Sequence, residues 1–501
     1  MEVKVDKLMR SGFASGVPLA FLHAAEALNL FSMTKEVAKG EGGDAWLKVL
    51  VEGGDERIEL NEAPGHRNRY NLNPLDPQGL FYRGSCTCGV LSEDTLKVME
   101  AKKAQLKVAG SDPDWADAQR TRLQAILDPN DRSEVFFGPS GTDLLYYPLL
   151  VARAQSKRPI LNVLSCPEEL GSGSRMAVAG KGFSLKTASQ IAQTKGALLH
   201  SDLESEVVEL PARSEEGGIC DRKADVRALI EANKDKMVIV HLVFGSKSGI
   251  KDDLEVIESL PNVIWTVDLC QFRADPELVD ALLAKGAMIL ITGSKFYQAP
   301  PFCGALLVPK AQAEQIGIQP PAAVTGLANI LVKNDIPTHF EGFRKCLPRE
   351  ENPASRMRWE CGLFEMERCH ALSREKIDHA ISEWNNVVSA SISNRPELEL
   401  MPDQSETNDS IISFRIRNAN GYFDGVAIKQ LFDRLTLGSW QEELGHERLF
   451  IGQPVCYGEK WFIRVALGSR SARVAVASGA SWSTDEQMVE LIANVARKMQ
   501  S

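Results

Sequence analysis

The fold of this chain can be predicted from one stretch, residues 263–309, which reads VIWTVDLCQFRADPELVDALLAKGAMILITGSKFYQAPPFCGALLVP. Its first apolar run, residues 263–267, predicts a buried parallel strand that ends on Asp268. A helical segment, residues 276–285, leads to a second apolar strand, after which the turn carries Lys295. A third strand is expected to follow. The stretch therefore places a carboxylate at the end of one strand and a lysine amine at the end of the next.

A strand-end carboxylate and a strand-end lysine are the two groups that pyridoxal 5'-phosphate (PLP) chemistry requires. The lysine amine holds the cofactor as a Schiff base, and the carboxylate keeps the pyridine nitrogen protonated so that the ring can accept electrons. A single lysine after a core strand is more often a plain surface residue. The combination of Lys295 with Asp268 and the flanking strands favours the cofactor site.

Two motifs in this stretch resemble those of the fold-type-I PLP enzymes, in the class V aminotransferase and cysteine desulfurase branch. Asp268-Leu269-Cys270-Gln271 resembles the D-x-x-Q of that branch. Lys295 resembles the lysine of its K-x-x-G-P-x-G-x-G-x-L, with glycines partly replaced in Ala299-Pro300-Pro301-Phe302-Cys303-Gly304-Ala305-Leu306. The resemblance implies that Lys295 and Asp268 are catalytic, that Asp268 pairs with the pyridine nitrogen, and that Gln271 contacts the 3'-oxygen. We add Thr292 and Ser294, just before Lys295, to the predicted cofactor contacts.

A second part of the predicted cofactor site lies upstream, in the turn Ser140-Gly141-Thr142. A predicted strand at 134–137 precedes this turn, and a predicted helix at 144–155 follows it. Free backbone N–H groups at the start of a helix bind phosphate. The position also fits the phosphate-binding turn of the resembling family. We therefore predict phosphate contacts from Ser140, Gly141 and Thr142.

The loops after the next two strands are expected to complete the site. After a strand at 159–164, the desulfurases have a histidine that stacks on the cofactor ring, but this chain has none there and alignment places Glu169 at that position. This departure leaves the reaction type open. A strand at 236–244 resembles the family strand that ends in small polar residues near the cofactor, which here are Ser246 and Ser248.

Alternating strands and helices from 134 to 308 predict an α/β fold, in which a mainly parallel sheet is covered on both sides. In such sheets the strand-end loops converge on one edge, where ligands bind. We divide the chain into an N-terminal extension or arm (1–105), a PLP-binding large domain (106–345) and a smaller α+β C-terminal domain (346–501). His241 lies in mid-strand, where a hydrogen-bonded core histidine is the favoured interpretation.

The C-terminal domain is expected to supply the group that binds the substrate. Its predicted strand at 461–467 alternates, so that Arg464 points away from the face formed by Ile463 and Val465. The segment resembles the one whose arginine clamps the substrate α-carboxylate in the family, and a guanidinium fork can form two parallel hydrogen bonds to a carboxylate. Arg464 is therefore the predicted substrate-binding residue, with Arg470 and Arg358 as the alternatives.

Other elements are predicted from local patterns. We expect a β-hairpin across residues 45–60, a long interdomain helix at about 363–394, and an insertion at 437–457 that lines the substrate pocket. A strand at 410–416 and a closing amphipathic helix at 485–499 belong to the C-terminal domain.

Composition excludes several classes of function. The net charge of −10 argues against a nucleic-acid surface. The ten cysteines show no disulfide spacing, which indicates reduced thiols and a cytoplasmic location. No apolar run approaches the length of a membrane span. Cys86 and Cys88 lack a second pair of metal ligands, so we predict a plain loop there and no metal site.

The sequence thus predicts a PLP-dependent lyase or transferase of amino-acid metabolism that takes a small amino-acid-type substrate. The resemblance implies a homodimer. We favour elimination, replacement or bond formation at Cβ or Cγ of a substrate bound as an external aldimine in a biosynthetic pathway, because Glu169 replaces the usual ring-stacking group. A class V aminotransferase is the alternative. A cysteine desulfurase is less favoured, since no Ser/Gly-rich loop carries an exposed cysteine, and retention of Lys295 and Asp268 argues against a non-catalytic relative.

Overall fold

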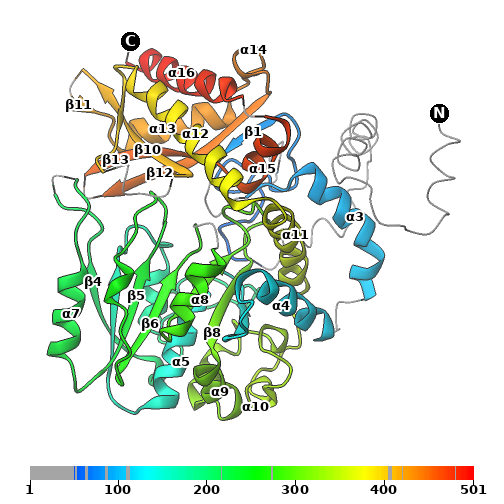
Figure 1. Ribbon diagram of the computed structural model, residues 1–501, viewed down its shortest axis with the longest axis vertical. Helices are drawn as coiled ribbons and strands as arrows, with labels where there is room; N and C mark the ends of the chain where they lie inside the picture. The colour runs from blue at the N-terminus through cyan, green and yellow to red at the C-terminus, as the bar shows by residue number, and fades with distance from the viewer. Residues whose placement is uncertain are drawn as a thin grey trace, which may run out of the picture. The chain divides into compact units, whose positions relative to one another are not determined.

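The structure is a computed structural model, in which the chain forms two units, residues 1–47 and residues 48–501. All that follows concerns the second unit (Figure 1). The residues that the structure describes are 50, 54–61, 66–84, 89–108, 113–215, 217–271, 275–403, 409–419, 421–457, 459–479 and 481–500.

The large domain is built on a mainly parallel sheet, as the sequence predicts. Seven strands of the described chain follow the order β2-β8-β7-β6-β5-β3-β4. All neighbours pair in parallel except β8, which is antiparallel to both β7 and β2. The strands are β2 (Ser133–Gly138), β3 (Ile160–Ser165), β4 (Glu206–Leu210), β5 (Met237–Val243), β6 (Val263–Asp268), β7 (Met288–Thr292) and β8 (Gly304–Pro309).

Helices pack against this sheet and contribute apolar residues to its core, among them Leu149 of α5 and Ile316 of α9. Helix α8 (Pro276–Ala284) starts where its sequence indicates, since the Asp275 side chain accepts a hydrogen bond from the Glu277 N–H and Pro276 occupies the first turn. Helix α5 packs on α9, and α4 packs on α8 (Figure 1). The other helices of this domain and its 3₁₀ turns complete the list: α4 (Pro113–Leu127), η4 (Asp143–Leu145), α5 (Tyr146–Gln155), α6 (Ser174–Val178), η5 (Ser201–Leu203), α7 (Lys223–Ala232), η6 (Leu254–Val256), α9 (Lys310–Ile318), η7 (Ala322–Leu327), η8 (Lys333–Asp335) and α10 (Glu341–Lys345).

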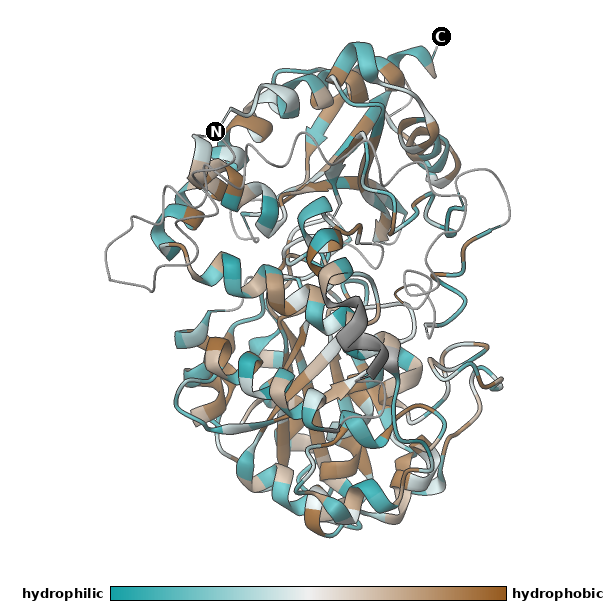
Figure 2. Ribbon diagram, turned by 90° about the vertical axis from the view of Figure 1, so that its right-hand side faces the viewer, coloured by the Kyte–Doolittle hydropathy of each residue, from teal (hydrophilic) through white to brown (hydrophobic). Residues whose placement is uncertain are grey.

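The sheet forms an apolar core, and its strands are coloured brown in Figure 2. His241 is the polar exception in β5, and its ring joins three neighbouring strands. Its Nε2 lies 2.8 Å from Asn162 Oδ1, and its Nδ1 lies 2.8 Å from Thr266 Oγ1. Burial lowers the pKa of His241 to about 3, so the ring is neutral. The prediction of a hydrogen-bonded core histidine is confirmed.

The small domain contains a second sheet, in the order β1-β12-β13-β10-β11 with β9 on β10. Its strands are β1 (Leu80–Arg83), β9 (Leu398–Leu400), β10 (Ile411–Asn418), β11 (Gly421–Tyr422), β12 (Arg448–Tyr457) and β13 (Lys460–Ala466). Helices α12 and α16 pack together here, and α13 packs on β12 (Figure 1). The remaining helices are α3 (Glu93–Val108), α11 (Pro353–His370), α12 (Arg374–Ser393), α13 (Gly425–Leu437), α14 (Gln441–Leu444), α15 (Ser469–Ser478) and α16 (Ser483–Lys498).

Part of the predicted N-terminal extension is built into the small domain. Strand β1 pairs in parallel with β12. Arg83, the last residue of β1, donates from Nε to Asp485 Oδ1 at 2.6 Å and from Nη2 to Asp485 Oδ2 at 2.9 Å. Trp384 Nε1 donates to the same Asp485 Oδ1 at 2.8 Å. A buried bidentate ion pair therefore holds β1 to the C-terminal helix.

Three local predictions are wrong. The segment at 363–394 forms two helices, α11 and α12, because Ser373 begins a new helix after the turn that follows His370. In the predicted hairpin, residues 56–60 form no strand, since the Asp55 carboxylate accepts from the Arg57 N–H at 2.9 Å and closes a turn. The predicted insertion contains β12, which lies between β1 and β13 and so is part of the small sheet, whereas its place along the substrate pocket stays a prediction. The predicted hairpin's first strand, apart from Leu50, and the Cys86–Cys88 pair lie outside the described residues.

Candidate active site

Asp268 and Lys295 lie at the same edge of the large sheet. Asp268 is the last residue of β6, and the half-buried Lys295 follows the end of β7, which pairs in parallel with β6. Burial raises the pKa of the Asp268 carboxyl group, while the nearby positive charge of Lys295 acts in the opposite direction. The two side chains that the sequence assigns to cofactor chemistry are therefore electrostatic neighbours.

The backbone after Asp268 is held in a fixed turn. Asp268 Oδ1 accepts a hydrogen bond from the Cys270 N–H at 2.8 Å. Thr292 Oγ1 donates to the carbonyl of Cys270 at 3.3 Å, which ties the end of β7 to the end of β6. Gln271 and Ser294 are both buried beside these strand ends. The structure thus brings together the predicted contacts that follow β6 and β7.

The turn at 140–142 packs against the same two strand ends. A Cβ placed on Gly141 would lie 3.1 Å from Cys270 Sγ and 3.4 Å from Thr292 Cγ2. A glycine at this position therefore lets the turn approach β6 and β7 closely. Buried Thr142 lies beside the loop after β3, since a Cβ on Gly171 would come within 2.8 Å of Thr142 Oγ1. Helix α5 continues from this turn through η4.

An acidic and a basic residue accompany this turn. Ser140 Oγ donates to Asp143 Oδ2 at 2.6 Å. Burial raises the pKa of Asp143 to about 7, against the opposing charge of Arg57. The Arg57 guanidinium lies 5.0 Å from the Phe302 ring centre and 5.7 Å from that of Phe183. Arg57 cannot be predicted from the sequence, because no local pattern links it to a turn more than eighty residues downstream.

Glu169 joins two strand-end loops. Its Oε2 accepts from Ser246 Oγ at 2.5 Å and from the Ser248 N–H at 2.7 Å, and its Oε1 accepts from Ser248 Oγ at 2.5 Å. All three residues are buried. The predicted contacts Glu169, Ser246 and Ser248 therefore lie together, and the carboxylate binds the loop after β5.

Arg464 extends from β13 to the large domain. Its Nη1 donates to the carbonyl of Lys247 at 2.8 Å, while its buried Nε has no hydrogen-bond partner among the described residues. Gly452, opposite Arg464 on β12, makes room for the side chain, because a Cβ there would lie 2.4 Å from Arg464 Cγ. The guanidinium is thus held between the domains with unused donor capacity.

Lys247 is a second site residue that the sequence motifs do not indicate, although it lies between Ser246 and Ser248. Its Nζ donates to the carbonyl of Glu168 at 2.9 Å. The pKa of Lys247 is lowered to about 8, first by burial and then by the charge of Arg464, with Lys295 acting in the same direction. Lys247 therefore lies close to both Arg464 and Lys295.

The donor set fits a PLP molecule. A glycine-containing turn before a helix suits a phosphate, a strand-end lysine suits an aldehyde, and an enclosed carboxylate suits a pyridinium nitrogen. The buried Nε of Arg464, which has no hydrogen-bond partner among the described residues, is a donor that a bound anion would use. The individual contacts remain predictions.

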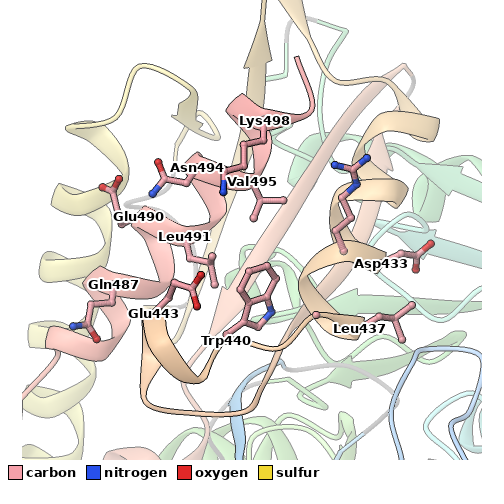
Figure 3. Close-up of a pocket in the computed structure, with 12 residues that line it drawn as sticks. Asp433, Leu437, Trp440, Glu443, Gln487, Glu490, Leu491, Asn494, Val495 and Lys498 are labelled. Carbon is pink, nitrogen blue, oxygen red and sulfur yellow. The ribbon is translucent and has the colours of Figure 1, made fainter. Parts of the chain in front are cut away.

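A cavity of about 1020 Å³ lies elsewhere, among α13, α14 and α16 (Figure 3). Trp440, Leu491 and Val495 form its apolar part, and charged residues such as Glu443 and Lys498 surround them. None of the predicted site residues lines it.

In the described part of the chain, none of the helices has the length and apolar character that crossing a bilayer requires.

This chain is similar to known proteins in structure and not detectably in sequence. No protein-family model and no curated protein matches it. A phosphoserine aminotransferase from Cytophaga hutchinsonii is similar in structure, with a TM-score of 0.52 and 14% identity over 82% of this chain and 97% of that one. Oryza sativa TDC, crystallised with PLP and tryptamine, gives a TM-score of 0.54 and 13% identity over 99% and 91%.

A NifS-like protein from Rickettsia africae gives a TM-score of 0.52 and 10% identity over 83% of this chain and 98% of that one. This chain therefore has the fold of the fold-type-I PLP enzymes, as the motifs around Asp268 and Lys295 predict.

Proposed function

We propose that this chain is a PLP-dependent enzyme that acts on an α-amino acid. The observation that carries the proposal is the proximity of Asp268 to Lys295 at one edge of the large sheet, beside the turn at 140–142. When bound, the cofactor supplies an electron sink for the bonds of the substrate Cα. Each protein group below has one task towards that cofactor or the substrate.

Lys295 binds the cofactor aldehyde through its amine. Asp268 keeps a proton on the pyridine nitrogen, which a carboxylate beside that nitrogen favours electrostatically. Gln271 contacts the 3'-oxygen. The phosphate is bound by Ser140, Gly141 and Thr142, together with Thr292 and Ser294. The support for this set is that the turn at 140–142 packs against the ends of β6 and β7.

Arg464 binds the substrate α-carboxylate. Its guanidinium is buried, has an unpartnered Nε and reaches the loop after β5. A fork of this kind fixes the orientation of the amino acid, and orientation decides which bond at Cα is broken.

For the reaction, we retain elimination, replacement or bond formation at Cβ or Cγ. The support is Glu169, which takes the position of the family's ring-stacking group and has both oxygens engaged by Ser246 and Ser248. Transamination is the second candidate, since a phosphoserine aminotransferase and a ureidoglycine-glyoxylate aminotransferase from Bacillus subtilis are similar in structure. A screen of amino acids that compares ketoacid formed with ammonia released separates the two. Ketoacid that appears only with an added amino acceptor would favour transamination.

We also propose that the enzyme is a cytoplasmic homodimer with its sites near the interface. The eight described cysteines are all free thiols, in keeping with a reducing compartment. Light scattering at micromolar concentration should give twice the chain mass of 55.1 kDa. A monomer mass would contradict the dimer and leave the cofactor proposal standing.

The direct test of the proposed function is cofactor binding. Protein purified with added PLP should be yellow, and Lys295→Ala should lose the Schiff-base absorbance. A colourless wild-type protein that does not retain PLP on dialysis would contradict the proposal. Lys285→Ala, a change of the same type at the end of α8, is the matched control.

A further inference from the structure

Three basic side chains gather where the strand-end loops of the large domain meet the small domain. Arg464 and Lys247 are joined by the hydrogen bond to the Lys247 carbonyl. Arg213 approaches from the segment after β4, with its guanidinium carbon 5.9 Å from the centre of the Tyr457 ring. The charge of Glu169 acts on the pKa of both Lys247 and Arg213, which places all of them around one carboxylate. We call Arg213, Lys247 and Arg464 the basic cluster.

The carboxylates of Glu169 and Asp403 act on the pKa of Arg213, and those of Glu169 and Glu168 act on the pKa of Lys247, but none of them forms an ion pair with the basic cluster. Among the described residues, none of these three side chains has an ion pair within 4.0 Å, and Arg213 Nη1 donates to the carbonyls of Gly217 at 2.7 Å and Pro402 at 3.1 Å. The carboxylate of Glu169 is already engaged by the hydroxyl groups of Ser246 and Ser248. The Nε atoms of both Arg213 and Arg464 are buried without a hydrogen-bond partner.

The printed hydrogen bonds of these three cations go only to backbone carbonyl groups, and enclosing a cation in this way is costly unless an anionic ligand offsets the cost. One α-carboxylate can occupy the fork of Arg464, but it leaves Lys247 and Arg213 without a carboxylate in direct contact. Lys247 is the nearer of these two to the chemistry, because the charges of both Arg464 and Lys295 act on it. A second anionic group on the substrate would meet this amine.

We propose that the substrate is an α-amino acid whose side chain ends in a second anionic group, a carboxylate or a phosphate, and that Lys247 binds this group. The inference rests on the proposed function, because it takes Arg464 as the residue that binds the α-carboxylate. Lys247 is then the residue that determines specificity. Its position between Ser246 and Ser248 fixes its backbone, since Glu169 binds both serines.

The protonation of Lys247 gives this role a pH signature. Its amine faces Arg464, Lys295, Glu168 and Glu169. With a pKa of about 8, the amine is charged below that pH and becomes neutral above it. Affinity for a dianion should therefore fall as the pH rises through 8, whereas affinity for a monoanion held by Arg464 should not, because an arginine stays protonated.

The experiment measures the binding of carboxylates that lack an amino group, so that the bond between Lys295 and the cofactor stays intact. Calorimetry on the PLP-loaded protein compares glutarate with pentanoate and succinate with butyrate, and 4-phosphonobutyrate tests the phosphate arm. In Lys247→Met, diacid affinity should fall about tenfold to a hundredfold, the range for a hydrogen bond between charged groups. Monoacid affinity should change less than about twofold. Lys247→Arg should keep diacid affinity and remove its loss above pH 8.

Lys251→Met is the matched control. Lys251 follows in the same loop, but its amine lies over the Phe244 ring, 5.8 Å from the ring centre, and is not part of the basic cluster. Equal losses for monoacid and diacid in Lys247→Met would overturn the proposal, since Lys247 would then share the α-carboxylate. Unchanged affinities for both ligands would also overturn it and leave Lys247 as a tie to the Glu168 carbonyl. The phosphonate distinguishes the two anion sources: tighter binding than glutarate indicates a phosphorylated side chain, and weaker binding indicates a carboxylate.

This test can fail separately from the proposed function. If the protein retains PLP on Lys295 but does not prefer diacids, only the specificity proposal falls. If the protein does not retain PLP, the proposed function falls, and the diacid comparison on the protein without cofactor still reports whether the basic cluster binds dianions.

Discussion

Arg464 Nη1 donates a hydrogen bond to the carbonyl oxygen of Lys247 at 2.8 Å, across the junction of the two domains. This contact connects β13 of the small sheet with the loop after β5 of the large sheet. It brings a buried guanidinium to the strand-end edge that also carries Asp268 and Lys295. The proposed carboxylate site is thus assembled from both domains.

Replacing Arg464 with lysine should weaken substrate binding while leaving the cofactor in place. The change keeps the charge but loses the planar fork, at a cost of about 1.5–3 kcal/mol, or roughly a ten- to hundredfold loss in kcat/KM. Steady-state kinetics and the visible absorbance of the loaded protein measure the two effects. Unchanged kcat/KM would mean that another arginine, Arg470 or Arg358, holds the carboxylate.

Gly452→Ala provides an independent test of the same side chain. The added methyl group would collide with Arg464 Cγ, so this variant should lose kcat/KM in the same direction as Arg464→Lys. Gly218→Ala is the control, because its added methyl group would meet no atom closer than 3.6 Å, so kcat/KM should stay unchanged. Gly421 is unsuitable as a control because it has a positive φ.

Asp268→Asn should retain the cofactor and lose turnover. An amide cannot stabilise a proton on the pyridine nitrogen, and loss of one preorganised electrostatic group costs on the order of a hundredfold or more. Cofactor content and kcat are measured together. Asp280→Asn, at an exposed ion pair with Arg132, is the matched control. Near-normal turnover in Asp268→Asn would show that another group performs this task.

Asp485→Asn should destabilise the whole small domain. It removes the carboxylate that binds Arg83 and leaves a buried guanidinium unpaired, which costs about 3–5 kcal/mol. Urea unfolding gives the free energy of unfolding. Glu341→Gln breaks an exposed pair with Lys345 and should cause no measurable change. A loss as small for Asp485→Asn would mean that β1 is not held as described.

His241 should make stability depend on pH. Its pKa is about 3 in the folded protein against 6.5 for the free side chain, so the unfolded state binds a proton first as the pH falls. Between about pH 6 and pH 4, His241 should therefore lower the free energy of unfolding by about 1.4 kcal/mol per pH unit. His241→Gln should show a correspondingly smaller slope in urea titrations. Equal slopes would contradict a neutral buried ring.

Much of the large domain can be predicted from local sequence because its strands are short apolar runs separated by turns. The strand predicted at 263–267 is β6, and the helix predicted at 276–285 is α8 within one residue. Apolar periodicity is sufficient for such elements, and parallel strands necessarily bring their ends to one edge. That is why the placement of Asp268 relative to Lys295 follows from the chain alone.

What the sequence does not reveal depends on contacts between distant segments. Strand β1 is four residues long and gains its partner, β12, from residues 448–451. The packing of Arg57 near Asp143, and the meeting of Arg464 with Lys247, likewise join segments more than eighty residues apart. No local periodicity encodes such pairs, because their energy comes from tertiary burial.

The site of cofactor attachment is the most direct test of the role of Lys295. Protein loaded with PLP is reduced with borohydride, digested and analysed by mass spectrometry. We predict one modified peptide, which contains Lys295, and its absence in Lys295→Ala. Lys247 is the sharpest competitor, since its amine is nearby and has a pKa of about 8. A peptide modified at Lys247 or at another lysine, or no modified peptide at all, would contradict the assignment of Lys295 as the residue that binds the cofactor.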